Sequence, residues 1–404
     1  MSIITYLFNE VCNLKKICIW FFICVMMFPT LVFAENQNVQ KNSEEVLIKN
    51  AKNGLLMEVS TGKILYEKNI DEKVSVASLT KMMAQLLILE KVEKGELSWD
   101  EKVTASINAS GMGGTQIWLT TGEVMSVRDL MKGITMASAN DATVAMAEKI
   151  AGTEESFVQM MNDRAKQLGL KNTTFKNCTG LDEDGHYSTA RDLATIAQEL
   201  LKHEQIFEFS SVYEDYLRTD TENKFWLVNT NKLVRLYEGA DGLKTGFTDN
   251  AKYCMAVTAK RDNMRLLAIV LGEEVSKVRN QETAELLDYG FNLYKVDLLQ
   301  SKKEKIDSIP LNKASVDSVD VYTKEDITIL NKKSDVSLDY DREVKINNIT
   351  LPLKNGTVVG KISFKYNNKI VKEEDLIVLE DVEKVNYFLY LFDSLMQVLS
   401  GALL

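Results

Sequence analysis

One helical pattern in this chain begins on a serine: SLTKMMAQLLILEKVEKG, residues 78–95. Its apolar residues recur at helical spacing, Ser78 is a residue type that caps helix N-termini, and Gly95 is typical of a helix end. The pattern therefore predicts a helix that starts near Ser78. Three positions apart at a helix start, the hydroxyl of Ser78 and the amine of Lys81 lie on one face and can meet.

The Ser78–Lys81 pair is favoured as nucleophile and base because the chain has only two histidines, His186 and His203. No GxSxG motif accompanies either of them, so the sequence gives no support to a Ser-His-Asp triad. A lysine can replace histidine as the base when burial or a second cation makes its ammonium more acidic. The start of a helix also presents unpaired backbone N–H groups, which suit a developing oxyanion.

Two further motifs follow along the chain. Ser138-Ala139-Asn140 lies in a break between two helices predicted over 127–152, and Lys244-Thr245-Gly246 precedes a strand pair predicted over 252–273. They would supply a proton-relaying hydroxyl, a substrate-binding amide, a second positive charge and a glycine that admits a substrate backbone. Each motif alone is equally typical of a helix cap or a strand-entry turn. All three in this order predict a catalytic serine site.

Two look-alike motifs are set aside. The SxxK of Ser60 and Lys63 spans the turn of a β-hairpin predicted over 55–69, which assigns its serine and lysine to different strands. The SxN of Ser106 and Asn108 lacks a helix-loop-helix context.

The N-terminus predicts export. Residues 17–33 (ICIWFFICVMMFPTLVF) are almost wholly apolar, follow Lys15-Lys16, and precede Ala34. Positive charge, an apolar core and a small residue at the cut site are typical of a secretory signal peptide over 1–34, and an uncleaved membrane anchor is the alternative. Either interpretation sends the rest of the chain out of the cytoplasm.

The C-terminus, VNYFLYLFDSLMQVLSGALL (385–404), is apolar except for one narrow polar stripe at helical spacing. We interpret 383–404 as an amphipathic helix that lies in a membrane interface, because Asp393 in its middle would be costly in a spanning helix. A terminal helix packed on the protein's own core is the alternative.

Composition limits the remaining possibilities. The chain has 404 residues and a formal charge of −10, which favours two domains and excludes a nucleic-acid protein. Few histidines and no CxxC pair argue against a metal site, and no organic cofactor is implied. Beyond the leader, Cys178 and Cys254 are predicted to be buried free thiols, with a bridge between them as the alternative.

The interior divides into two predicted domains, 35–300 and 301–382. The first mixes helices and strands and closes with a helix over 282–294. The second has short alternating runs at 327–330, 336–340, 344–353, 358–366 and 375–379, and Asn355-Gly356 is a strong hairpin signal. We therefore expect a small all-β domain in this part of the chain.

The three motifs in this order resemble those of penicillin-binding proteins and serine β-lactamases. The surrounding segments VASLTKMM, TQIWLTTGE, ITMASANDATVAMAE, FKNCTGLDEDGHYSTARDLA, NTNKLV, DGLKTGFTDNAKYCMAVTAKR and LLDYGF narrow the resemblance to low-molecular-mass serine-type D-alanyl-D-alanine carboxypeptidases over residues 45–295. The resemblance implies an α/β (α+β) transpeptidase-like domain, with an antiparallel sheet flanked by helices. The β domain and tail are similar to the family's second domain and membrane anchor.

The resemblance also implies roles for individual residues. His186 looks like a structural loop residue. The catalytic set is Ser78 as the acylated nucleophile, Lys81 as its base and Ser138 as the proton shuttle. The substrate-binding set is Asn140 for an amide, Lys244 for charge, Thr245 for the terminal carboxylate, Gly246 for close approach, Phe247 with Ser78 for an N–H oxyanion hole, and Arg279 for the carboxylate.

The implied reaction removes the last D-alanine from peptidoglycan stem peptides that end in D-Ala-D-Ala, and β-lactam antibiotics would acylate Ser78. The expected location is the outer face of the cytoplasmic membrane, with the membrane surface bound through the C-terminal helix. A β-lactamase and a non-catalytic penicillin-binding sensor are the alternative functions.

The chain departs from the family at Val76 and Cys178, where proline is usual, at Ala139, where glycine is usual, and at Lys252, where a small residue is common. We expect Ala139 and Lys252 to line the edge of the cleft.

Overall fold

The computed structural model describes residues 47–335 and 338–385, together with six helical positions in the C-terminal tail. Residues 1–46, with the predicted signal segment, lie outside the described residues. No described helix has the length and hydropathy that a membrane crossing requires.

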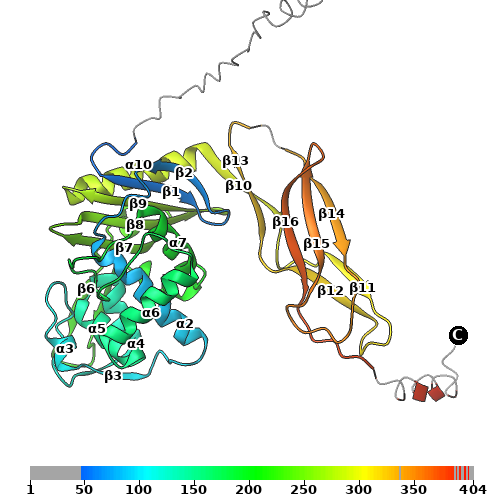
Figure 1. The fold of residues 1–404 in the computed structure, drawn as a ribbon, viewed down its shortest axis with the longest axis horizontal. Coiled ribbons are helices and arrows are strands. Elements are labelled where there is room, and N and C mark those ends of the chain that lie inside the picture. The colour runs from blue at the N-terminus through cyan, green and yellow to red at the C-terminus, as the bar shows by residue number, and fades with distance from the viewer. Residues whose placement is uncertain are drawn as a thin grey trace, which may run out of the picture. The chain divides into compact units, whose positions relative to one another are not determined.

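A five-stranded antiparallel sheet forms the framework of the first domain (Figure 1). The predicted hairpin and strand pair are confirmed. The segment with Lys244-Thr245-Gly246, expected just before the strand pair, is itself a strand at the edge of the sheet. In spatial order the strands are β2 (Lys63–Lys68), β1 (Asn53–Glu58), β9 (Met264–Glu273), β8 (Lys252–Arg261) and β7 (Ala240–Thr248).

Both faces of this sheet are covered, which explains the long apolar runs of its central strands. In β9, Leu267 and Ile269 join the core beneath the helical region, whereas Leu266 and Ala268 face the opposite way. Alternate side chains of a strand point to opposite faces, so each face requires its own covering layer. The second face is closed by α10 (Ser276–Leu293), which begins six residues earlier than the predicted closing helix.

The helical region fills the other side of the sheet (Figure 1). The predicted break around residue 138 is confirmed, although the first of the two helices ends in a turn of π-helix. The helices and turns are η1 (Ala77–Thr80), α2 (Lys81–Glu93), α3 (Ile107–Ser110), α4 (Val127–Lys132), η2 (Gly133–Ala137), α5 (Asn140–Ala151), α6 (Glu154–Gln167), α7 (Ala190–Leu200), η3 (Glu204–Ile206), α8 (Phe207–Ser210) and α9 (Leu233–Leu236). Two small hairpins join them: β3 (Lys102–Thr104) with β4 (Val124–Ser126), and β5 (Glu214–Leu217) with β6 (Phe225–Val228).

The set-aside motifs have structural roles, as expected. Ser60 lies in the β1–β2 turn and bonds to the Glu58 carboxylate, and Ser106 caps α3 through the N–H of Ala109. Cys178 and Cys254 are buried free thiols, which confirms that prediction.

The second domain is all-β, as predicted, but its pairing differs from the expectation in two places. Asn355-Gly356 forms a turn that joins no hairpin, because β15 pairs with β14 and β16. The tight hairpin lies at Asn367-Asn368, where both residues have positive φ, a backbone that asparagine tolerates. The strands are β10 (Tyr294–Gln300), β11 (Asp307–Pro310), β12 (Ser318–Thr323), β13 (Ile327–Lys332), β14 (Asp341–Ile346), β15 (Val358–Tyr366) and β16 (Lys369–Val378).

Strand pairing also bears on where this domain begins. β10, which precedes residue 301, pairs with β13 of the all-β domain. Of the expected run at 344–353, only the first three residues belong to a strand, and the described part of 336–340 has no strand.

The described tail positions are helical, and their large apolar side chains are exposed. These positions are Phe388, Leu391, Phe392, Leu395, Met396 and Leu399.

Candidate active site

Ser78 lies in a short 3-10 turn, η1, which runs directly into α2 at Lys81. The α-helix therefore begins three residues later than predicted, but the two side chains still meet: Lys81 Nζ is 2.9 Å from Ser78 Oγ. Ala77, just before the serine, has a φ of 48°, a left-handed backbone that is costly for a residue with a side chain. Such strain persists only where the surroundings fix the backbone.

Two glycines hold this turn by close approach. A Cβ on Gly180 would lie 2.0 Å from the Ala77 carbonyl oxygen, and one on Gly246 would lie 3.0 Å from the Ser78 nitrogen. The 177–180 loop and strand β7 therefore press against the serine from two directions, and neither position has room for a side chain.

Lys81 is fully buried, and its amine is surrounded by three oxygens. Besides Ser78 Oγ, Nζ lies 2.7 Å from Asn140 Oδ1 and 2.6 Å from the Thr179 carbonyl oxygen. The last two oxygens can only accept hydrogen bonds, so they take the two N–H groups of a neutral amine. A protonated amine donates to Ser78 Oγ as well, whereas a neutral one has its lone pair left for the Ser78 hydroxyl, as a general base requires.

Burial lowers the pKa of Lys81 from 10.5 to about 7, against the opposing influence of Cys178 and Asp141. Sequence reasoning named burial or a second cation as the cause, and burial is the main one here. Lys244 is also fully buried, and burial, together with the charges of Lys81 and Arg279, holds its own pKa well below the usual range.

The loop after η2 brings Ser138 and Asn140 to the same place. Ser138 has a φ of 63°, and its carbonyl oxygen accepts a hydrogen bond from Thr115 Oγ1 at 2.8 Å. The N–H of Asn140 bonds in turn to the Thr115 carbonyl at 2.7 Å. The Asn140 side chain bridges Lys81 and the Gly113 carbonyl. Sequence reasoning expected this amide to bind substrate and did not foresee its contact with the lysine.

Strand β7 forms the opposite wall. Lys244 is buried and donates to the Thr245 carbonyl oxygen at 3.0 Å, and Thr245 Oγ1 donates to Thr230 Oγ1 at 2.8 Å. Phe247 is half exposed and packs against Tyr253, with ring centroids 4.4 Å apart.

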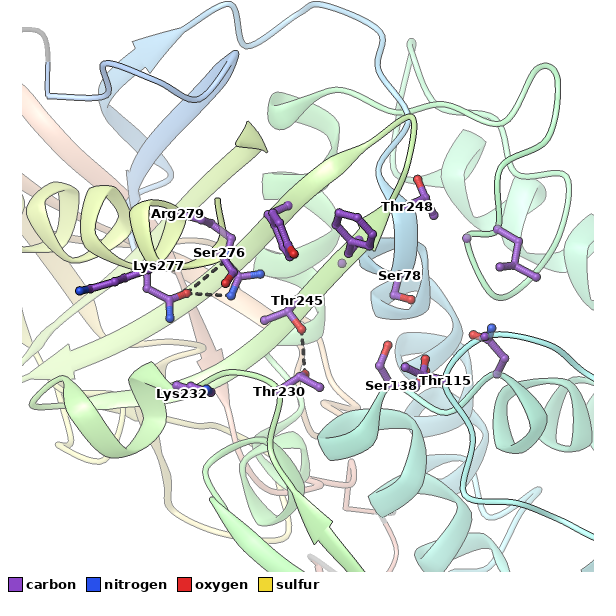
Figure 2. Close-up of a pocket in the computed structure, with 18 of the residues that line it drawn as sticks. Ser78, Thr115, Ser138, Thr230, Lys232, Thr245, Thr248, Ser276, Lys277 and Arg279 are labelled. Atoms are coloured by element: carbon purple, nitrogen blue, oxygen red, sulfur yellow. Dashed lines mark hydrogen bonds between the residues drawn. The ribbon is translucent and has the colours of Figure 1, made fainter. Parts of the chain in front are cut away.

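A cleft of about 860 Å³ lies between these walls. Figure 2 shows Ser78, Thr115 and Ser138 on one side of it, and Thr230 and Thr245, joined by a hydrogen bond, on the other. Three cations line the cleft, namely Lys232, Lys277 and Arg279, and none of the described residues that line it is acidic. The cleft thus offers an anionic ligand a cationic pocket in a chain of net negative charge.

Sequence reasoning placed Arg279 here but missed several lining residues. Thr230 and Lys232 lie in the NTNKLV segment, which was noticed only as part of the family resemblance, and Thr115 opens the TQIWLTTGE segment. Nothing in the sequence marked Lys277 as part of the site, because a lysine on any ordinary surface helix has the same sequence pattern.

His186 has the structural role that was expected. Its Nδ1 accepts a hydrogen bond from the Lys176 backbone N–H at 3.3 Å, and its Nε2 lies 2.8 Å from Thr80 Oγ1. Burial lowers its pKa to about 4, so the ring is neutral at physiological pH. It fastens the 176–187 loop to the turn that carries Ser78.

Two of the departures lie elsewhere than expected. Ala139 is fully buried and does not line the cleft, and Lys252 does not line it either: its amine lies 3.6 Å from the Glu274 carboxylate. At Cys178, both the backbone N–H and the thiol bond to Glu154 Oε1, at 3.1 and 3.2 Å.

Comparison with known proteins matches both domains. The family model described as D-alanyl-D-alanine carboxypeptidase matches residues 38–275, and the one described as penicillin-binding protein 5, C-terminal domain, matches residues 294–384. The chain is 44% identical over 370 residues to the D-alanyl-D-alanine carboxypeptidase DacF of Bacillus subtilis, covering 91% of this chain and 94% of that protein.

Solved structures agree with these matches. Penicillin-binding protein 5 of Haemophilus influenzae is similar with a TM-score of 0.66 at 30% identity, over 83% of this chain and 98% of that one. Penicillin-binding protein D2 of Listeria monocytogenes, solved in an ampicillin-bound form, is similar with a TM-score of 0.54 at 36% identity, over 60% of this chain and 97% of that one.

The contact of Gly180 with the serine turn leads to a stability prediction. We expect Gly180→Ala to lower the free energy of unfolding by about 3 kcal/mol or more. The new Cβ would collide with backbone atoms, and alanine would be strained at the positive φ of this position. Gly185→Ala is the matched control. It lies in the same loop with a similar φ, but its Cβ meets only the flexible end of Lys176, so about 1 kcal/mol is expected. Chemical denaturation measures both, and equal losses would contradict the close-approach argument.

Proposed function

This chain belongs to the D-alanyl-D-alanine carboxypeptidase family, the serine-type penicillin-binding proteins, and we propose that it works through an acyl-enzyme on Ser78. The observation that carries the proposal is the set of three oxygens around Lys81 Nζ, two of them acceptors and one the Ser78 hydroxyl. That set leaves the lone pair of a neutral amine for the serine proton.

The proposed reaction has two stages. Ser78 Oγ attacks the carbonyl of the penultimate D-alanine while its proton passes to Lys81, and the N–H groups of Ser78 and Phe247 stabilise the oxyanion. Ser138 relays the proton to the departing amine, so that the last D-alanine leaves with a neutral amino group. Water then attacks the ester, and Lys81 serves as the base again. Asn140 orients both the lysine and a substrate amide.

The cationic cleft supports a substrate with a free C-terminal carboxylate. Arg279 and Thr245 would bind that carboxylate directly, with Lys232 and Lys277 adding to the attraction. A bound carboxylate would also favour the charged form of the buried Lys244, whose pKa is otherwise lowered. Strand β7 lies at the edge of the sheet, where a substrate backbone can pair with it. The missing side chain of Gly246 makes room for the turn that carries Ser78.

We further propose that residues 1–34 export the protein and that the tail, 383–404, holds it at the outer face of the cytoplasmic membrane. The exposed apolar side chains of the described tail positions support this arrangement. The catalytic domain would be 35–300 and the small β domain 301–382, although β10, which ends at residue 300, pairs with β13 of the β domain. Removing 383–404 should abolish sedimentation of the secreted chain with anionic lipid vesicles. Undiminished sedimentation would contradict the anchor.

β-Lactam binding is implied by the family, and we propose acylation of Ser78 as its chemistry. A β-lactamase would release the opened antibiotic quickly, whereas a carboxypeptidase releases it slowly. A non-catalytic sensor would bind penicillin and release no D-alanine. The Ser78–Lys81 geometry supports the carboxypeptidase over the sensor, because the base is already in contact with the nucleophile.

The direct test is hydrolysis of diacetyl-L-lysyl-D-alanyl-D-alanine by the purified protein. We expect release of D-alanine and stoichiometric labelling by fluorescent penicillin, and we expect Ser78→Ala to lose both. Labelling without release would favour the sensor, and rapid turnover of penicillin the β-lactamase. Activity retained by Ser78→Ala would refute the assignment of the nucleophile.

The lowered pKa of Lys81 predicts how acylation depends on pH. The neutral amine is the active form, so the rate of penicillin acylation should rise about tenfold per pH unit below a pKa of about 7 and level off above it. His186 titrates at about 4 and cannot produce the same profile. Stopped-flow labelling between about pH 5 and pH 9 measures the profile.

Lys81→Arg is the control for this profile, because a guanidinium stays protonated throughout the range and cannot act as the base. We expect its acylation rate to fall by about a thousandfold or more, in line with the loss of a general base and of the packing around the amine. A wild-type rate that is flat across the range would exclude Lys81 as the titrating base.

A further inference from the structure

A second concave surface lies outside the catalytic cleft, between the β3–β4 and β5–β6 hairpins. It is a groove of about 890 Å³, and Trp118 is part of its lining. The Trp118 side chain is 66% exposed, although tryptophan is usually among the well-buried residue types. Its φ is 59°, a left-handed backbone that is a marked outlier for so bulky a residue.

Two charged side chains, those of Asp141 and Arg218, fix the backbone on both sides of Trp118. The buried Asp141 carboxylate accepts the N–H groups of Ile117 and Leu119, at 3.1 and 2.9 Å. The Arg218 guanidinium donates to the carbonyl oxygens of Ile117 and Trp118, at 3.0 and 3.4 Å. Four hydrogen bonds thus hold a strained backbone at an exposed tryptophan, which indicates a function for the ring.

Asp141 and the short segment from Thr115 to Trp118 also connect the groove to the cleft. Asp141 follows Asn140 directly, and Thr115, which lines the cleft, lies only three residues before Trp118. Three residues span at most about 10 Å of extended chain. A ligand that occupies the cleft and continues for a few more residues can therefore reach the indole.

The rest of the groove has polar, apolar and charged residues. Thr120, Thr121, Thr221 and Asn223 supply hydroxyl and amide groups, and the charged residues are of both signs: Lys102, Arg218 and Lys224 against Glu123 and Asp129. A flat aromatic ring beside several neutral hydrogen-bonding groups suits a pyranose ring, which presents a C–H face for stacking and hydroxyl groups at its rim.

We propose that this Trp118 groove binds the amino-sugar strand to which the stem peptide is attached. The inference rests on the proposed function, because it assumes that the cleft holds a peptidoglycan peptide. Four residues separate the scissile bond from the sugar, a reach of about 14 Å when extended, which is compatible with the short link between cleft and groove. The enzyme would then recognise the glycan as well as the D-Ala-D-Ala end.

The test compares two substrates that differ only in the sugar: a disaccharide-pentapeptide and the same pentapeptide without sugars. For wild type we expect a higher kcat/KM with the disaccharide, and for Trp118→Ala we expect the ratio of the two kcat/KM values to fall about five- to tenfold, the size of one aromatic contact. Trp118→Phe should retain most of the ratio. Trp226→Ala is the matched control, because Trp226 is 57% exposed on β6 but does not line the groove.

A ratio that Trp118→Ala leaves unchanged, or equal hydrolysis of both substrates by wild type, would overturn the inference. Failure to hydrolyse either substrate would instead refute the proposed function. Quenching of tryptophan fluorescence by N-acetylglucosamine tetramer decides the sugar site without activity: saturable quenching in wild type and Trp226→Ala, and its loss in Trp118→Ala, are expected. The thermal midpoint of each variant checks that it is folded.

Discussion

The structure depends on keeping one lysine amine dry and in contact with a serine. Lys81 lies in the core among three oxygens, and burial brings its pKa to about 7. Those oxygens come from three separate segments: the η1 turn, the start of α5 and the 177–180 loop. A shift in any one of them would open the amine to water and raise its pKa towards that of an ordinary lysine.

The close approach of those segments explains several backbone features that the stability of the fold alone does not explain. Left-handed residues at Ala77 and Ser138, and the glycines Gly180 and Gly246, allow backbones to come nearer than side chains permit. The same frame continues outward from the site. Asn140 orients the amine, and its neighbour Asp141 fixes the loop that exposes Trp118. Catalytic geometry and the surface around it are therefore built from one set of contacts.

The sequence predicted the local parts of this arrangement well. Helical spacing placed Ser78 and Lys81 on one face, and segments rich in valine, alanine and leucine identified the β8–β9 pair, because these signals depend on neighbours along the chain. It did not reveal that Lys244 lies within an edge strand, or that the Thr179 carbonyl contacts the amine. A backbone carbonyl has no residue-specific signature, and strand order is set by packing between distant segments. The prediction of a hairpin at Asn355-Gly356 was wrong for the same reason. The two residues do form a turn, but β15, which follows it, pairs with β14 and β16.

The reactive amine also lowers stability, and the two effects have one origin. The unfolded chain holds a proton on Lys81 up to the ordinary pKa of 10.5, whereas the folded chain loses it near 7. Between these values the unfolded state binds more protons, so the contribution of this group to the free energy of unfolding rises with pH. The difference corresponds to about 5 kcal/mol at neutral pH relative to pH values above 10.5. The two hydrophobic cores, one on each side of the sheet, offset such a cost.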